Sequence, residues 1–208
     1  MRALLVGSTG RVGQAFLELA LGGGHGVTAI ARDTSRVKLN HPHLTVVQAD
    51  VLDRESLRNV FGAEPFDAAV NVAGADPLKP SALVTQAASN LIPLLEEFGV
   101  KRYLGITGTA QMPKTRIGEL SSFMLRRTPV RHAIRDHTGA LSVVKSSSLD
   151  WFLVGCPWIK DGPATGRFQR SKVFPGGMRS IHPGDVASRL YEEFERPTLH
   201  RQIEGIWY

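Results

Sequence analysis

The chain has little cysteine and no long apolar run. Cys156 is the single cysteine among 208 residues, which excludes an internal disulfide and favours a reducing compartment. No apolar stretch approaches the roughly 20 residues that a membrane-spanning helix needs. The chain enters an apolar run at residues 3–6, which leaves no room for a signal peptide. We therefore expect a cytoplasmic protein without a membrane partner.

Acidic residues are also in deficit, with 19 Asp and Glu against 25 Lys and Arg, a net charge of +6. Such an excess can mark a nucleic-acid-binding protein. Aromatic residues, however, make up only 7% of the chain and do not interleave with the densest basic group, so no surface for stacking bases is indicated. That group contains Lys114, Arg116, Arg126, Arg127, Arg131 and Arg135. A site for a small anionic substrate explains the excess equally well, and no nucleic-acid partner is expected.

Short apolar runs alternate with longer helical stretches, the pattern of βαβ units. The predicted strands are Arg2–Val6, 27–31, Leu44–Gln48, 68–72, 102–107, 151–154 and Gln202–Trp207. The predicted helices are 12–21, 54–61, 81–98, 135–146 and 185–195. The chain shows no repeat and no linker, so residues 1–208 are predicted to form one doubly wound α/β domain with a mainly parallel sheet flanked by helices. Its substrate region is expected in the strand-end loops and the C-terminal part.

The least regular segment runs from residue 113 to residue 129 and contains a candidate short helix over 119–127. In an α/β protein such a segment is either a lid beside the substrate or a surface excursion. Composition favours neither interpretation over the other.

Three glycines at a spacing of three follow the first strand directly. Gly7 permits a tight turn, Gly10 lets backbone N–H groups approach a pyrophosphate, and Gly13 lets the next helix pack closely against the strand. A glycine-rich turn without a ligand is the alternative interpretation. The position directly after an apolar strand favours a dinucleotide-binding turn of the Rossmann type.

The residues after the second strand bear on the choice of dinucleotide. NAD-binding units carry an acidic residue for the ribose hydroxyls at this point, but here Arg32 stands there, and a guanidinium suits a 2′-phosphate. Arg36 and Ser35 lie within reach of the same group, whereas Asp33 leaves room for NAD. The alternative is that Arg32 and Arg36 are solvated turn residues that bind no cofactor. We predict NADP as the cofactor, with NAD as the weaker candidate.

Polar or small residues also end the later strands, where they could reach the cofactor or could simply serve as turn formers. Asp50 and Val51 are expected near the adenine, and Val72, Ala73 and Gly74 near the nicotinamide ribose. The residues predicted to hold the cofactor are Gly7, Ser8, Thr9, Gly10, Arg11, Val12, Gly13, Arg32, Ser35, Arg36, Asp50, Val51, Val72, Ala73, Gly74, Thr107, Pro157 and Trp158.

These motifs resemble those of the atypical short-chain dehydrogenases/reductases of the NAD(P)H-binding group, in particular its biliverdin reductase B/flavin reductase-like and NmrA-like members. The similarity extends over nearly the whole chain, from the turn at 7–13 and the segment 31–36 to Asp161-Gly162-Pro163 and Asp185-Val186-Ala187. The resemblance implies a Rossmann-type fold, a nicotinamide cofactor and hydride transfer.

The chain departs from the wider superfamily at the catalytic centre. The Tyr-x-x-x-Lys motif, in which lysine activates tyrosine for proton transfer, is absent, and Gly108 falls where flavin-reductase-like members carry serine. Thr107 and Thr109 are the candidate substitutes. His137 is a third catalytic candidate, because Asp136 could orient its ring for general acid catalysis, although a locally capped histidine is the more ordinary interpretation.

Other reactive side chains have ordinary explanations. His41 and His43 lack acidic or cysteine companions at ligand spacing, so no metal site is predicted. Cys156 is predicted to be a small buried residue. Trp158 and Phe168 could stack on a flat substrate or pack in the core.

Two functions of different classes remain open. The first is an NADP(H)-dependent oxidoreductase that acts on a small, planar or anionic substrate, as a monomer or weak homodimer. The second is a non-catalytic NADP(H)-binding redox sensor, which the missing Tyr-x-x-x-Lys motif favours. An epimerase is disfavoured because the C-terminal part is too short for a sugar-nucleotide domain.

Overall fold

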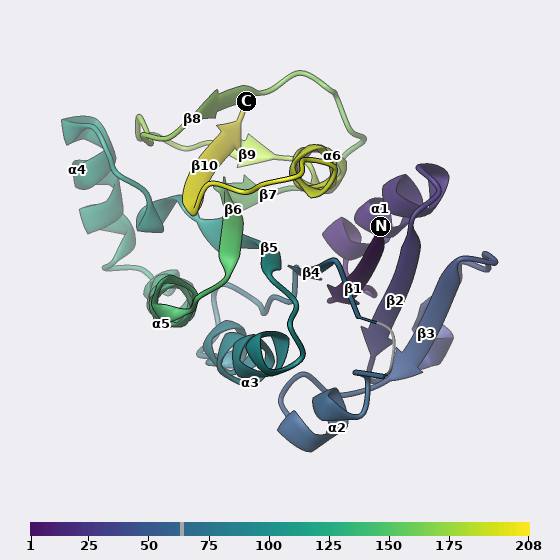
Figure 1. Cartoon of the computed structure of the whole chain (residues 1–208). Helices are drawn as coiled ribbons and strands as arrows, with labels where there is room; N and C mark the ends of the chain where they lie inside the picture. The colour runs from purple at the N-terminus through teal and green to yellow at the C-terminus, as the bar shows by residue number, and fades with distance from the viewer. Residues whose placement is uncertain (63–64) are drawn as a thin grey trace.

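One mainly parallel sheet forms the centre of the computed structural model, which describes residues 1–62 and 65–208 (Figure 1). In these residues the sheet has eight strands in the order β3-β2-β1-β4-β5-β6-β10-β8. Their bounds are β1 Arg2–Val6, β2 Gly26–Ala31, β3 Leu44–Gln48, β4 Ala68–Asn71, β5 Arg102–Gly108, β6 Asp150–Cys156, β8 Gln169–Ser171 and β10 Gln202–Trp207. Only β8 runs antiparallel to its neighbour. The order reverses between β1 and β4, and the crevice beyond the ends of those strands is where such sheets bind ligands.

Helices cover both faces of the sheet (Figure 1). On one face α1 (Arg11–Gly22) packs against α6 (Pro183–Phe194), and the rings of Phe16 and Phe194 meet edge to face at 5.7 Å. The other face carries α2 (Arg54–Arg58), α3 (Leu83–Glu97) and α5 (Arg131–Ser146), whose apolar side chains share a second core. The central strands are therefore buried on both sides, which explains their continuous apolar sequences.

The architecture confirms the predicted α/β fold class, and every predicted strand forms. The helix predicted over 135–146 begins at Arg131 instead, because the turn at Thr128 and Pro129 accepts the N–H groups of Arg131 and His132. The helix predicted over 54–61 ends at Arg58, and Phe61 leaves it to stack on Phe98 at 4.7 Å between ring centroids.

The remaining elements are short. The candidate helix of the irregular segment forms as α4 (Arg116–Leu125), and Thr115 caps it by accepting the N–H of Gly118 at 3.2 Å. Two 3₁₀ turns, η1 (Thr34–Arg36) and η2 (Thr109–Gln111), follow β2 and β5. The strands β7 (Trp158–Ile159) and β9 (Ser180–Ile181) pair with each other. The sequence did not predict β7, β8 or β9, because two or three residues cannot show an alternating pattern. Within the described ranges, no helix has the length and apolarity to cross a bilayer.

A buried carboxylate joins α3 to α5. Ala82 at the start of α3 has no side-chain acceptor, and Asp136 of α5 supplies one by accepting the N–H groups of Val84 at 3.0 Å and Thr85 at 2.8 Å. The hydroxyl of Thr85 donates in return to the Asp136 carbonyl at 2.7 Å. An anion at a helix N-terminus is stabilised by the helix dipole as well. This contact fixes the first half of α5 against the start of α3.

A second buried charge cluster joins α6 to β6 and β10. Arg189 is 2% exposed, bonds to Glu193 at 2.5 Å and Glu204 at 2.6 Å, and lies over the ring of Phe152 at 4.6 Å. Glu193 is completely buried. Desolvating these charges is costly, and their mutual attraction offsets that cost only while the partners are present.

Replacing Arg189 with Met is expected to lower the free energy of unfolding by about 3–5 kcal/mol, because Glu193 and Glu204 lose their main counter-ion. The control Lys79→Met removes an exposed pair with Asp76 and should cost less than about 1 kcal/mol. Urea denaturation followed by circular dichroism measures both changes. Equal losses in the two variants would show that the buried cluster does not stabilise the fold as argued.

Candidate functional site

The three glycines form a turn that brings β1, α1 and β4 into backbone contact. Gly7 has a φ of 87°, and a Cβ on it would lie 2.7 Å from the backbone nitrogen of Ala73. A Cβ on Gly13 would overlap the carbonyl of Gly7. The N–H of Gly10 donates to that carbonyl at 3.0 Å and closes the turn. The absence of side chains at these positions is therefore a steric requirement of the fold itself.

The start of α1 offers N–H groups to an anion. Gly10 precedes the helix, and because it has no side chain it cannot cap the first turn. The first helical hydrogen bond runs from Gln14 to Gly10, so the N–H groups of Arg11, Val12 and Gly13 have no partner within the helix. Such N–H groups, together with the helix dipole, bind phosphates. The geometry of the turn therefore fits a pyrophosphate.

The side chains next to this turn are already engaged. Ser8 is buried and its hydroxyl donates to the carbonyl of Ile30 at 2.9 Å, which ties the turn to β2. The carbonyl of Thr9 accepts a bond from the Gln14 side chain at 3.5 Å. The guanidinium of Arg11 pairs with the carboxylate of Asp161. Ser8 therefore has only its backbone to offer to a phosphate, whereas both members of the Arg11–Asp161 pair remain exposed to solvent.

Arg32 and Arg36 are exposed at the end of β2. Within the described residues neither makes an ion pair. Asp33 accepts the N–H and the hydroxyl of Ser35 at 3.0 and 2.6 Å. These bonds lower the pKa of Asp33 and place its carboxylate inside its own turn. The two guanidinium groups thus remain available, while Asp33 and the Ser35 hydroxyl satisfy each other.

The residues predicted near the adenine and ribose lie on the neighbouring strand ends. Asp50 accepts the N–H of Leu52 at 3.0 Å, and the carbonyl of Val51 accepts the Asn90 amide at 3.0 Å. Val72 is buried, Ala73 is half-buried and Gly74 is exposed with no atom near its missing Cβ. The structure places these residues at the carboxyl ends of β3 and β4.

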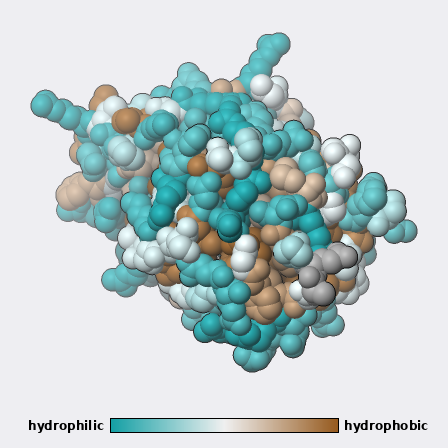
Figure 2. Space-filling model, in the orientation of Figure 1, coloured by the Kyte–Doolittle hydropathy of each residue, from teal (hydrophilic) through white to brown (hydrophobic). Residues whose placement is uncertain are grey.

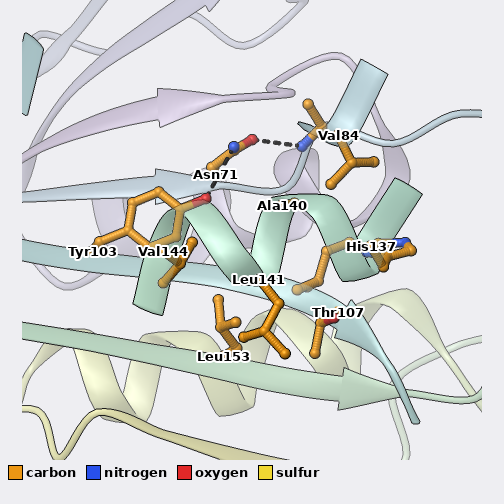
Figure 3. A pocket seen from close by; sticks show the side chains of 11 residues that line it. Asn71, Val84, Tyr103, Thr107, His137, Ala140, Leu141, Val144 and Leu153 are labelled. Atoms are coloured by element: carbon orange, nitrogen blue, oxygen red, sulfur yellow. Dashed lines mark hydrogen bonds between the residues drawn. The ribbon is translucent and has the colours of Figure 1, made fainter. Parts of the chain in front are cut away.

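A small pocket, lined mainly by apolar side chains, lies deeper, between the sheet and α5 (Figure 3). Its polar groups come from Asn71 of β4, Tyr103 and Thr107 of β5, and His137 of α5. The amide of Asn71 donates to the Tyr103 hydroxyl at 3.1 Å and accepts the N–H of Ala73 at 3.1 Å. The pocket has barely the space for one water molecule.

Two polar atoms lining this pocket are buried without a partner in the part of the chain that the structure describes: Thr107 Oγ1 and His137 Nδ1. Buried polar atoms are almost always hydrogen-bonded, so each such atom requires an explanation. Two unpartnered atoms in one pocket are what a binding site shows when its ligand is needed to complete the hydrogen bonds.

The predicted partnership of Asp136 with His137 is wrong. The Asp136 carboxylate bonds the start of α3 instead, because successive residues on a helix point in different directions. Burial lowers the pKa of His137, and the charge of Asp136 opposes this effect only in part. His137 is therefore a neutral imidazole near pH 7, suited to donate or accept a hydrogen bond.

The remaining predicted residues lie around this centre. Thr109 is buried at the start of η2, one residue beyond β5. Pro157 is half-buried between β6 and β7, and Trp158 is 46% exposed. Cys156 is buried, and its burial raises the pKa of the thiol to about 12, so it is not a nucleophile. Across residues 1–62 and 65–208, no three acidic, His or Cys side chains gather as metal ligands.

Sequence reasoning missed the Asn71–Tyr103 pair as part of the site. Burial raises the pKa of Tyr103 to about 12, although its bond to Asn71 acts in the opposite direction. An asparagine within an otherwise apolar strand was the available indication, since a buried amide must find partners. Asp161, as the partner of Arg11, could not be identified because 150 residues separate the two in sequence.

Comparisons with known proteins agree with this geometry. The model of the NAD(P)H-binding family matches residues 7–197. The uncharacterized protein YwnB of Bacillus subtilis (strain 168) is 27% identical over 208 residues, covering 95% of this chain and 93% of YwnB.

Solved structures share the whole fold. ChuY, an anaerobillin reductase from Escherichia coli O157:H7, superposes with a TM-score of 0.81 at 25% identity and covers 99% of this chain and 96% of its own. SP1627 of Streptococcus pneumoniae TIGR4, named as a candidate NADH-flavin reductase, superposes with a TM-score of 0.75 at 22% identity, covering 100% and 99%. At that identity the second likeness shows the fold alone. The family model spans both the glycine turn and the later strand ends, and the chain belongs to the NAD(P)H-binding family.

Proposed function

We propose that this protein is an NADP(H)-dependent reductase that transfers hydride to a small, planar and anionic acceptor. The observation that carries the proposal is the pair of exposed guanidinium groups of Arg32 and Arg36 at the end of β2, which form no ion pair with any residue the structure describes. They lie beside a glycine turn whose N–H groups have no partner within the helix. The turn suits a pyrophosphate, and the arginines suit the additional 2′-phosphate that distinguishes NADP from NAD.

The state of Asp33 supports NADP over NAD. An acidic residue that recognises ribose must keep its carboxylate free for the two hydroxyls. The carboxylate of Asp33 is instead occupied by the N–H and the hydroxyl of Ser35. The positive charge of Arg36 also lowers the pKa of Asp33, after the two Ser35 bonds. Arg32 and Arg36 are thus the groups at this strand end that remain free for a ligand.

Polar side chains of the small pocket, Thr107 near the end of β5 and His137 of α5, supply hydrogen bonds to the reacting end of the proposed site. The pocket has space for about one water molecule, so the acceptor binds outside it. The bound nicotinamide would provide the hydride, so the protein has to orient the acceptor and deliver a proton. The hydroxyl of Thr107 can donate its proton in a hydrogen bond and has no partner among the described residues. The neutral His137 lines the same pocket. We assign to Thr107 a hydrogen bond with the acceptor or with the carboxamide of the nicotinamide. We assign to His137 the orientation of the acceptor. Thr109, one residue beyond β5, adds a second hydroxyl group at this strand end.

The surroundings favour a flat acceptor with negative charge. Trp158 exposes nearly half of its surface just beyond β6. Arg167 and Lys172 are exposed nearby in the chain, while Arg170 is committed to Glu192 at 2.7 Å. The named activities of ChuY and SP1627 involve anaerobillin and flavin, which gives a direct choice of acceptors to assay.

A non-catalytic NADP(H) sensor is the second candidate. Its supporting observation is that Tyr103, the tyrosine that lines the pocket, is held by Asn71 with a pKa of about 12 and has no lysine four residues later. Comparing NADPH affinity with NADPH consumption over flavins, anaerobillin and quinones separates the two. Tight binding without consumption of NADPH would leave the sensor.

Replacing Gly13 with Ala is expected to weaken NADPH binding by about tenfold or more, a loss of about 1.4 kcal/mol, because the methyl group forces the start of α1 away from Gly7. Gly22→Ala at the other end of the same helix meets no atom within 4 Å and serves as the control. NADPH fluorescence titration measures both affinities. Unchanged affinity in Gly13→Ala would remove the pyrophosphate from this turn.

Replacing Arg32 with Asp is expected to weaken NADPH binding by about 10- to 100-fold, the value of a charge-assisted bond of about 1.5–3 kcal/mol, with a much smaller change for NADH. The control Lys101→Asp makes the same charge change just before the amino end of β5, away from the carboxyl ends of the parallel strands, where Arg32 lies. Calorimetric titration gives the four affinities. An equal loss for both nucleotides would remove the basis for NADP preference.

Replacing Thr107 with Val is expected to lower kcat by about tenfold or more while leaving stability unchanged, since the hydroxyl has no partner to lose among the described residues. Steady-state kinetics with the best acceptor of the panel, together with thermal unfolding, tests this. A wild-type kcat in Thr107→Val would exclude the hydroxyl from the reaction.

A further inference from the structure

The orientation of α4 is the reverse of what its amphipathic sequence leads one to expect. Its large apolar side chains face solvent: Ile117 is 67% exposed, Leu120 63%, Met124 59%, Phe123 52% and Leu125 40%. These five residues form what we call the α4 apolar face. Soluble proteins rarely expose a contiguous apolar surface of this kind without a partner for it.

The inward face of α4 consists of small residues. Gly118 and Ser122 are buried, and a Cβ on Gly118 would lie 2.7 Å from the carbonyl of Phe174. The hydroxyl of Ser121 accepts the N–H of Gly177 at 3.1 Å. This close backbone packing fixes the rotation of the helix, so α4 cannot turn its apolar face inward without losing the contact.

Positive charge is concentrated in the sequence around α4. From Lys114 to Arg135 the sequence contains six basic residues and one acidic residue, Glu119. The guanidinium of Arg127 lies over the ring of Phe123 at 3.7 Å, directly beside the face. Arg116 and Arg126 are exposed and, within the described ranges, form no ion pair. A partner of this surface must therefore be both apolar and anionic.

The position of α4 in the fold favours a flat partner. The helix stands at the outer edge of the molecule, away from the sheet (Figure 1), and Figure 2 shows brown and tan side chains over this edge beside teal, hydrophilic ones. The adjoining segment that packs on α4 adds two more exposed apolar side chains, Val173 at 42% and the fully exposed Met178. A protruding helix of this kind suits the interface of a bilayer, where amphipathic helices lie in the plane with basic residues at the headgroups.

A second copy of the chain fits this face less well. Antiparallel pairing of two α4 helices about a twofold axis would bring Arg116 of one copy near Arg126 and Arg127 of the other. Like charges in contact oppose such pairing. We propose that the α4 apolar face docks onto an anionic lipid bilayer, which makes the protein a peripheral membrane protein. The expectation of no membrane partner followed from the lack of a spanning segment, and a surface helix binds a bilayer without one.

Flotation with phosphatidylcholine vesicles, with and without phosphatidylglycerol, tests this directly. The wild-type protein should float only with the anionic vesicles and should be released by high salt. The double variant Leu120→Gln, Met124→Gln should lose about tenfold or more of this binding, because the two side chains no longer enter the interface. Arg126→Gln, Arg127→Gln should bind more weakly and with less dependence on salt.

The control Leu39→Gln, Leu52→Gln replaces two exposed leucines near the β3 edge of the sheet and should float like the wild type. Affinity for NADPH, measured on every variant, verifies the fold independently of lipid. The proposal is overturned if the wild-type protein does not float, or if the α4 double variant floats equally well. It is also overturned if sedimentation shows a dimer that the same variant dissociates, which would assign the face to a second copy.

Discussion

The backbone contact between the glycine turn, the start of α1 and the end of β4 is the constraint on which the rest of the site depends. Gly7 and Gly13 leave no space for a Cβ, so the first helix begins directly against two parallel strands. The same contact places free N–H groups at the crevice where the strand order reverses. Close packing and phosphate recognition therefore have one cause, and a side chain at either glycine would disturb both.

The buried polar groups of this fold are of two kinds, those that join helices to neighbouring elements and those that line the proposed site. Asp136 and Arg189 bond residues of neighbouring elements, α5 to α3 and α6 to β10, which makes them structural. Thr107 and His137, by contrast, keep unpartnered atoms in one pocket, as far as the described residues extend. Because leaving a polar atom unpaired costs free energy, the meeting of two such atoms in one pocket favours a place where a ligand completes the hydrogen bonding.

The helix α4 extends the same reasoning to the surface. Its small residues pack inward because backbone contact with the segment at 174–177 is possible only there, and its large apolar residues are consequently exposed. The charge around it is almost entirely positive. A reductase docked on an anionic bilayer through this helix would keep its nucleotide turn at a different part of the molecule, since α4 and α1 lie on opposite sides of the fold (Figure 1).

The sequence by itself determined the alternation of strands and helices, the glycine turn and the nicotinamide cofactor, because each depends on local periodicity or on one turn. The helix bounds at Arg131 and Arg58 were missed by a few residues, since turn bonds and ring packing set them. Only the tertiary structure decided that Asp136 caps α3 instead of orienting His137, that Asn71 holds Tyr103, and that α4 faces outward. These depend on contacts between segments far apart in the chain or on which face of a helix is packed, and neither is encoded in spacing along the sequence.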